Sequence, residues 1–180
     1  MRKEIFKEIE IPSGTEVGTD ENRITIKGKI GEDSKEFNSG KIKIKTEGNK
    51  IIIGSKDATK KEKRIINTFT AHIKNMIRGV NEGFEYKLKA VYSHFPITVE
   101  VHGKEAMIKN FLGEKIPRKM KILDGANVKI DKDFITVSSH SKEIAGQTAA
   151  NFEKATRIAL RDRRVFQDGI FITNKGGEEI

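Results

Sequence analysis

Lysines and arginines are the residues of this chain whose types and spacing could do chemistry. The segment 113–121 holds four of them in a stretch punctuated by glycine and proline: Lys115, Arg118, Lys119 and Lys121. Ammonium and guanidinium groups in such a loop can lie along a phosphate backbone. A loop whose charges are merely solvated is the competing interpretation, so the segment is a candidate polyanion site with one open alternative.

Two more groups of cations lie at the ends of predicted helices. The run 161–164 includes Arg163 and Arg164 at the end of the second predicted helix, where positive charge also favours the helix dipole. The start of the first predicted helix carries cations that the dipole disfavours, by roughly a few tenths of a kcal/mol each. An anionic partner would explain this group, which comprises Lys60, Lys61, Lys63 and Arg64.

No constellation for catalysis or metal binding can be read from the sequence. The four histidines are scattered, without the spacing of metal ligands. Ser139 and Lys142 have the spacing of a serine nucleophile with a lysine base, although helix capping explains the serine without chemistry. Asp131 and Asp133 fall in a predicted hairpin turn, where Asp forms local hydrogen bonds. We therefore expect no enzyme, no cofactor and no metal, with a serine hydrolase as a minor alternative.

The composition favours a nucleic-acid-binding protein with a modest core. The 180 residues carry 35 Lys+Arg against 26 Asp+Glu, a formal net charge of +9. Such a chain attracts polyanions, of which nucleic acid is the commonest inside a cell. The absence of cysteine excludes a disulfide scaffold, a zinc ribbon, an iron–sulfur site and a thiol nucleophile. No apolar run approaches 18 residues and no secretory signal is readable, so a cytoplasmic location without membrane contact is expected.

The aromatic residues bear on the kind of nucleic acid. Most of the ten Phe and two Tyr residues fall at apolar positions of predicted helices and strands, among them Phe69, Phe84 and Phe152. No run along the chain interleaves aromatic and basic side chains, as a platform for unpaired bases requires. The sequence therefore favours recognition of the backbone and shape of folded RNA or of a duplex.

Two helices, each preceded by a strand hairpin, are the elements that must position these cations. Apolar residues at helical spacing predict helices over about 60–79 and 142–164. Alternating apolar and polar residues around short turns predict hairpins over 41–53 and 128–137. The order of hairpin, polar loop and helix therefore occurs twice.

The repeated order predicts an internal duplication. At a shift of 84 positions the first hairpin and helix fall on the second, with few identities but with the same sequence of elements. The fold class we predict is α+β, with two tandem duplicated domains over 1–81 and 82–180. Each is a small antiparallel β-sheet packed against one long α-helix. Thr59 and Glu62 form a capping box that marks the start of the first helix.

Four short motifs in a fixed order carry a family resemblance. They are GFEYKL at 83–88, HFPI at 94–97, NFLGEK at 110–115 and DGIFI at 168–172. Together with the duplicated layout they resemble the large-subunit ribosomal protein six family over about 6–175. The closing DGI followed by an aromatic residue is similar to the archaeal and eukaryotic branch of that family.

The resemblance implies a structural constituent of the large ribosomal subunit with no catalytic activity. Members of the family bind large-subunit ribosomal RNA, chiefly through the second domain, near the translation-factor-binding region and the base of the stalk. The implied partners are this RNA, neighbouring ribosomal proteins at the stalk base and translation factors nearby, with the chain a monomer within the ribosome. A basic protein-interaction scaffold within another ribonucleoprotein is the alternative. The candidate RNA-facing residues are Lys115, Arg118, Lys119, Lys121, Arg163, Arg164 and Lys175, while Lys60, Lys61, Lys63 and Arg64 rest on charge alone.

Overall fold

The computed structural model describes residues 3–20, 23–37 and 40–180. The chain divides into two compact units, Met1–Gly83 (unit 1) and Phe84–Ile180 (unit 2). The boundary lies two residues beyond the one expected from the sequence, because the first helix continues to Glu82. The two units are described separately.

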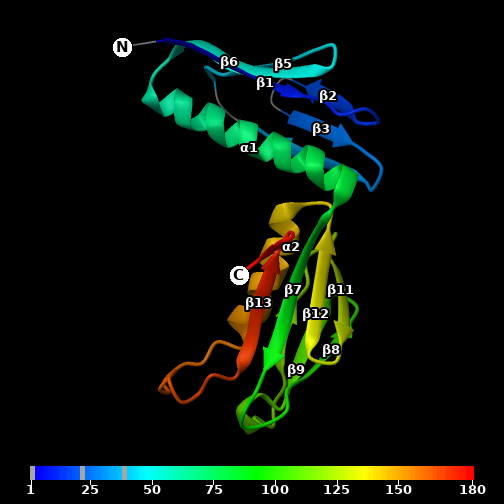
Figure 1. Cartoon of the computed structure of the whole chain (residues 1–180), viewed down its shortest axis with the longest axis vertical. Helices are drawn as coiled ribbons and strands as arrows, with labels where there is room; N and C mark the ends of the chain where they lie inside the picture. The colour runs from blue at the N-terminus through cyan, green and yellow to red at the C-terminus, as the bar shows by residue number, and fades with distance from the viewer. Residues whose placement is uncertain (1–2, 21–22, 38–39) are drawn as a thin grey trace. The chain divides into compact units, whose positions relative to one another are not determined.

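Unit 1 consists of one helix and two three-stranded antiparallel sheets, with strand orders β1-β6-β5 and β2-β3-β4. The helix α1 (Lys60–Glu82) packs its apolar side on the sheets. Figure 1 shows α1 lying along them. The strands are β1 (Lys3–Glu10), β2 (Glu16–Asp20), β3 (Arg23–Lys27), β4 (Glu32–Glu36), β5 (Lys43–Glu47) and β6 (Lys50–Ala58).

Helix α1 begins and ends at residues that satisfy its free backbone groups. The predicted capping box is confirmed, since the Thr59 side chain bonds the first turn and the Glu62 carboxylate accepts from the Thr59 backbone N–H at 2.9 Å. Hydrogen bonds from the Thr59 side chain and backbone lower the pKa of Glu62 to about 2. The sequence offered two glycines as the end of this helix, Gly79 and Gly83. Gly79 is buried within the helix, and the helix ends at Gly83, whose φ of 75° suits glycine.

Unit 2 repeats this plan and adds to it. A five-stranded sheet has the order β11-β12-β7-β13-β14 and a three-stranded sheet has the order β10-β9-β8. One helix, α2, packs on the larger sheet. The elements are β7 (Phe84–Val91), β8 (Thr98–His102), β9 (Glu105–Lys109), the 3-10 turn η1 (Phe111–Gly113), β10 (Arg118–Lys121), β11 (Asn127–Asp131), β12 (Phe134–Ser139), α2 (Lys142–Ala155), β13 (Gly169–Lys175) and β14 (Glu178–Glu179).

The strand orders confirm a duplicated α+β fold and refine it. The order β1-β6-β5 in unit 1 corresponds to β7-β12-β11 in unit 2, and β2-β3-β4 corresponds to β8-β9-β10. Each unit therefore holds two small sheets, where the sequence predicted one. Strands β13 and β14 have no counterpart among the described residues of unit 1, and β13 lies against β7 (Figure 1).

The second helix is shorter than predicted. It ends at Ala155 and not near residue 164, because buried Thr156 leaves the helix to bond β13: its hydroxyl accepts from the Ile170 N–H at 2.9 Å. Leu160 then adopts φ 60°, which is incompatible with a right-handed helix. The chain from 157 to 168 is consequently an irregular, largely exposed connection.

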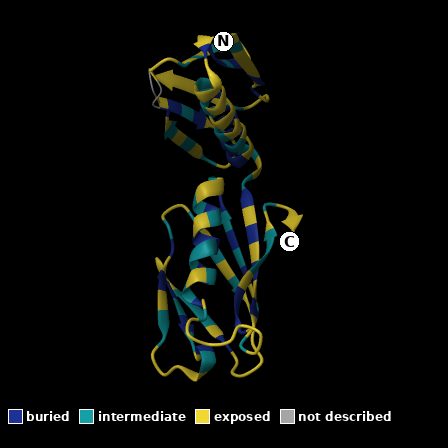
Figure 2. Cartoon of the chain, turned by 90° about the vertical axis from the view of Figure 1, so that its left-hand side faces the viewer, coloured by how far each residue is buried: buried dark blue, intermediate teal, exposed yellow. Residues whose placement is uncertain are grey.

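Each unit buries one hydrophobic cluster between its helix and its sheets. Strand β7 shows the pattern most clearly, because Phe84, Tyr86, Leu88 and Ala90 are buried while the residues between them are exposed. Figure 2 shows this alternation of buried and exposed positions along the strands. One face of the larger sheet in unit 2 therefore meets the core, and the other face is left to solvent.

Candidate nucleic-acid interface

Arg118 is held by the protein itself. Its guanidinium donates to both carboxylate oxygens of Glu114, at 2.8 and 2.5 Å, and to the Ala155 carbonyl at 2.9 Å. It also lies 4.3 Å from the centre of the Phe111 ring. The hydrogen bond from Arg118 lowers the pKa of Glu114. This residue ties the loop before β10 to the end of α2, which is a structural role for a residue predicted to face RNA.

The other predicted cations of this segment point outward. Lys115 is exposed in the loop between η1 and β10. Lys119 and Lys121 are exposed on β10, on either side of buried Met120. Strand β10 is an edge strand of its sheet, so these two exposed lysines lie at the border of that sheet.

The cations of the run 161–164 lie in the exposed connection and not at a helix end. Arg163 and Arg164 occupy a turn between α2 and β13. The Arg164 backbone N–H donates to the Asp162 carboxylate at 3.0 Å, and its side chain, which is 92% exposed, lies 3.3 Å from the same carboxylate. The helix-dipole explanation for these arginines therefore no longer applies.

The structure brings these two predicted groups of cations together. The Arg118 guanidinium also reaches the Arg157 carbonyl, at 3.4 Å, so the loop before β10 lies beside the connection after α2. The charge of Arg161 acts on Glu114 and helps to lower its pKa. One side of unit 2 thus joins cations that are more than 30 positions apart in the sequence.

A buried carboxylate fixes the base of the connection. Asp168 is 1% exposed and accepts hydrogen bonds from the Ser93 N–H at 3.3 Å, the Ser93 hydroxyl at 3.0 Å, the His94 N–H at 3.3 Å and the His94 ring Nδ1 at 2.9 Å. Burial alone raises the pKa of Asp168, but the bonds from His94 and Ser93 outweigh it, and the pKa is lowered. The DGI motif therefore joins the start of β13 to the end of β7.

Two rings and one guanidinium form a short column next to this carboxylate. The Phe166 ring stacks on His94, with centroids 4.9 Å apart and planes inclined by 18°. The Arg161 guanidinium lies 4.8 Å from the centre of the Phe166 ring. Sequence reasoning missed Phe166 and His94 in this role, because the contact between the two rings joins residues 72 positions apart.

A hollow of about 850 Å³ lies beside this column. Its lining includes the cations Lys154, Arg157 and Arg163 and the aromatic residues Phe166 and Phe171. The two carboxylates in the lining, Glu153 and Asp168, accept hydrogen bonds from backbone N–H groups. No side-chain hydrogen bond or ion pair of these three cations is found in the described part of the chain. Their charges are consequently available to an anion.

The remaining predicted cations lie elsewhere. Lys175 is exposed at the end of β13 opposite to Gly169, so a strand of seven residues, about 20 Å long, separates it from the connection. Lys60, Lys61, Lys63 and Arg64 are exposed at the start of α1 in unit 1, and three of them border a shallow hollow with Asn67. Sequence-predicted cations therefore fall into one assembled group in unit 2 and two outlying sets.

The arrangements that resemble catalytic sites lack the geometry for catalysis. Ser139 is buried and donates to the Gly125 carbonyl at 2.8 Å, so the hydrolase alternative loses its nucleophile. In the Ser93–His94–Asp168 cluster the hydroxyl and the carboxylate both meet Nδ1, whereas a triad uses both ring nitrogens. Across the described residues, no group of three or more His, Cys, Asp or Glu side chains could hold a metal ion.

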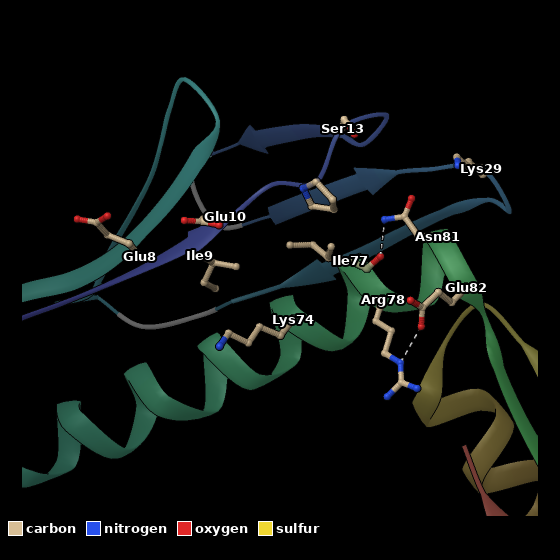
Figure 3. Close-up of a pocket in the computed structure, with 11 residues that line it drawn as sticks. Glu8, Ile9, Glu10, Ser13, Lys29, Lys74, Ile77, Arg78, Asn81 and Glu82 are labelled. Atoms are coloured by element: carbon tan, nitrogen blue, oxygen red, sulfur yellow. Dashed lines mark hydrogen bonds and ion pairs between the residues drawn. The ribbon is translucent and has the colours of Figure 1, made fainter. Parts of the chain in front are cut away.

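A hollow of about 790 Å³ in unit 1 gives no clearer chemistry. Carboxylates and cations alternate on its wall, and Arg78 pairs with Glu82 at 3.0 Å inside it (Figure 3). Such mixed charges favour neither an anion nor a cation. Over the part of the chain that the structure describes, neither helix has the length and apolar character needed to cross a membrane.

The fold and surface define a class: a basic protein of two duplicated α+β units with exposed cations gathered on one side of the second unit. Two stretches, residues 11–83 and 95–169, match the family described as Ribosomal protein L6. The chain therefore belongs to the ribosomal protein L6 family, whose members are structural, non-enzymatic components of the large ribosomal subunit. The matched stretches begin 84 positions apart, at residues 11 and 95, which agrees with the shift seen in the sequence.

Archaeal relatives extend the match to nearly the whole chain. Large ribosomal subunit protein uL6 of Methanobrevibacter smithii is 46% identical over 171 residues, which cover 95% of this chain and 96% of that protein. The uL6 proteins of Methanocella arvoryzae and Methanosarcina mazei are each 45% identical, over 176 and 175 residues, and cover 97% of this chain and 99% of those proteins. These relatives confirm the predicted family and the predicted location in the ribosome of the cytoplasm.

Proposed function

We propose that the chain binds large-subunit ribosomal RNA mainly through unit 2 and stabilises the tertiary structure of that RNA. The observation that carries this proposal is the joining of the loop before β10 to the connection after α2, which gathers exposed cations on one side of the unit. Cations held at fixed positions on a rigid scaffold can bridge phosphates of separate RNA segments. The contacts we assign to phosphate are made by Lys115, Lys119, Lys121, Arg157, Arg161, Arg163 and Arg164.

Arg118 acts in this proposal as a positioning residue. Its donors are used by Glu114 and Ala155, so it sets the shape of the loop that presents Lys115. Asp168 does the same for the connection, through Ser93 and His94. Lys175 and the cations at the start of α1 are placed at secondary contacts.

The family resemblance supports a finer placement. We infer that unit 2 lies near the translation-factor-binding region and the base of the stalk, beside neighbouring ribosomal proteins, with the chain present as one copy. In this position the protein holds RNA in the shape that factors meet and takes no part in a chemical step.

The salt dependence of binding to a large-subunit RNA transcript tests the proposal. Each phosphate contact contributes about 0.9 to the slope of log affinity against log salt, so six contacts give a slope of about −5. Single changes Lys115→Gln, Lys119→Gln and Arg163→Gln are each expected to reduce the slope by about one unit. Lys29→Gln, an exposed lysine in the turn between β3 and β4, is the matched control and leaves the slope unchanged. Unchanged slopes in all three unit 2 variants would contradict the proposal and leave the protein-interaction scaffold as the better account.

A further inference from the structure

The solvent-facing side of the larger sheet in unit 2 carries two exposed phenylalanines in one row. Phe134 on β12 and Phe171 on β13 are both paired with Lys89 on the central strand β7. Figure 1 shows β7 between β12 and β13. The two residues are 53% and 44% exposed, so their rings are open to solvent. We call Phe134, Lys89 and Phe171 the aromatic row.

Basic residues lie on the same face, next to the row. Lys87 and Lys129 are both in register with Thr136, two residues along from Phe134. Lys89 Nζ lies 5.6 Å from the centre of the Phe134 ring, near the outer limit of a cation–π contact. Aromatic and basic side chains therefore interleave across three strands, although they never interleave along the sequence.

The acidic groups of this face lie at its borders. Asp131 is paired with Phe134 from the edge strand β11, and Glu85 forms an exposed ion pair with Lys87 at 3.5 Å. The centre of the face, around Lys89, consists of a cation between two rings. The charge at the centre is thus complementary to an anionic chain.

The backbone presents Phe171 with its ring laid back along the strand. A Cβ atom at Gly169 would lie 3.0 Å from Cζ of this ring, so a larger residue at position 169 would force the ring to shift. Phe171 and Arg163 both line the 850 Å³ hollow. The ring therefore has Lys89 on one side and the cationic connection on the other.

From this arrangement we propose that the aromatic row stacks unpaired nucleobases of an RNA strand. Antiparallel strands lie about 4.8 Å apart, so the two rings stand about 10 Å apart and each can take a separate base. Stacking needs only the π-face of a base, and Lys89 and Arg163 would meet the intervening phosphates. The inference rests on the proposed RNA binding and adds a single-stranded RNA segment as a ligand of unit 2.

Binding of two oligonucleotides to the full chain tests this inference. The probes are a single-stranded octaadenylate and an abasic octamer with the same phosphates, each labelled with a fluorophore. Phe134→Leu and Phe171→Leu remove the rings but keep apolar side chains at exposed positions, so the unfolding midpoint should stay unchanged. Each change is expected to weaken octaadenylate binding about 5- to 150-fold, with no effect on the abasic probe. Phe6→Leu, a phenylalanine in unit 1 that is 47% exposed, is the control and should alter neither affinity.

The outcomes separate this inference from the proposed function. If both variants bind octaadenylate as tightly as the unchanged chain, the row does not stack bases, while binding of the large-subunit transcript can still stand. If the variants lose affinity for both probes equally, the rings do not contribute by stacking on bases, and the inference is overturned. If they keep both RNA affinities but lose a neighbouring ribosomal protein, the face is a protein interface. Failure of the unchanged chain to bind the transcript would remove the proposed function itself.

Discussion

Single residues in unit 2 divide into those that hold the surface in shape and those that are free to meet RNA. The polar atoms of Arg118 and Asp168 form hydrogen bonds with neighbouring protein groups. Lys115 and Arg163 are exposed, and neither makes a side-chain hydrogen bond or ion pair among the residues that the structure describes. Mutations at the first pair should therefore act on stability, and mutations at the second pair on affinity.

Replacement of Arg118 should show this division. Arg118→Ala leaves the Ala155 carbonyl and the Glu114 carboxylate without their partner, and hydrogen bonds to charged groups contribute about 1.5–3 kcal/mol. We expect a loss of this size in the free energy of unfolding of unit 2, measured by urea denaturation. Lys115→Ala, three positions away in the same loop, should leave stability unchanged and reduce the salt slope. A variant of Arg118 that loses slope but no stability would show that the guanidinium faces RNA after all.

The buried carboxylate makes unit 2 sensitive to acid. Because the pKa of Asp168 is lowered in the fold, its ionised form stabilises the native state at neutral pH. This contribution is complete above the pKa of an unfolded Asp, about 3.9, and is lost as the pH falls through the lower folded value. Asp168→Asn is expected to lower stability at pH 7 by about 1–3 kcal/mol and to flatten the dependence between pH 4 and pH 2. Urea denaturation over this range, with Asp131→Asn as a carboxylate control, measures the effect, and an unchanged acid limb in Asp168→Asn would refute it.

At the scale of elements, β13 distinguishes unit 2 from unit 1. It covers the side of β7 that corresponds to an edge of β1, and it brings Phe171 and the DGI motif into the sheet. Its own outer edge is sealed, since Ile170 N–H donates to Thr156 and Ile172 N–H donates to the Glu153 carboxylate at 3.0 Å. Side chains of α2 and its C-cap thus keep this edge from pairing with another chain.

The substitution Thr156→Val removes the hydroxyl that accepts the hydrogen bond from the Ile170 N–H, with little change in the shape of the side chain. The substitution leaves the Ile170 N–H buried without a partner, so unit 2 should lose about 1–3 kcal/mol of stability. Hydrogen exchange at the Ile170 amide should also become faster. Thr136→Val, on the solvent-facing side of the sheet, makes the same chemical change at a half-exposed position and should have little effect. Equal exchange rates at Ile170 in both variants would show that Thr156 does not protect the edge.

Periodicity predicted the helices and hairpins but not where the second helix stops. Apolar spacing in α2 continues to Ala159, so the sequence alone extends the helix, whereas a bond between Thr156 and a strand 14 positions later ends it. The site divides in the same way. Exposed lysines such as Lys115 could be found from composition, while the internal bonds of Arg118 and the aromatic row depend on contacts between distant segments.

At the level of the whole molecule, the two units share a duplicated scaffold, and unit 2 has additional strands. Both units have cationic surfaces. Unit 2 adds β13, which has no counterpart among the described residues of unit 1, and it places Arg161 against the Phe166 ring. In unit 1 the cations at the start of α1 oppose the helix dipole. They are a secondary site in our account.

Neutralising the α1 cluster tests this ranking. We consider a variant in which Lys60, Lys61, Lys63 and Arg64 are all changed to Gln. Its free energy of unfolding should rise by roughly 1 kcal/mol in total, because cations no longer oppose the helix dipole. It should therefore unfold at a slightly higher denaturant concentration. Its salt slope should fall by less than that of the triple change Lys115, Lys119 and Arg163 to Gln, for which a drop of about three units is expected. A larger drop for the α1 variant would reverse the ranking of the units.

Photochemical cross-linking of RNA to protein, in intact large ribosomal subunits that contain this chain, would locate the residues of the chain that contact RNA. Peptides bearing nucleotide adducts can be identified by mass spectrometry and assigned to residues. Our account predicts that adducts concentrate in segments 113–121 and 157–171, with fewer at the start of α1. Adducts confined to unit 1, or an absence of adducts in both of those segments, would contradict it.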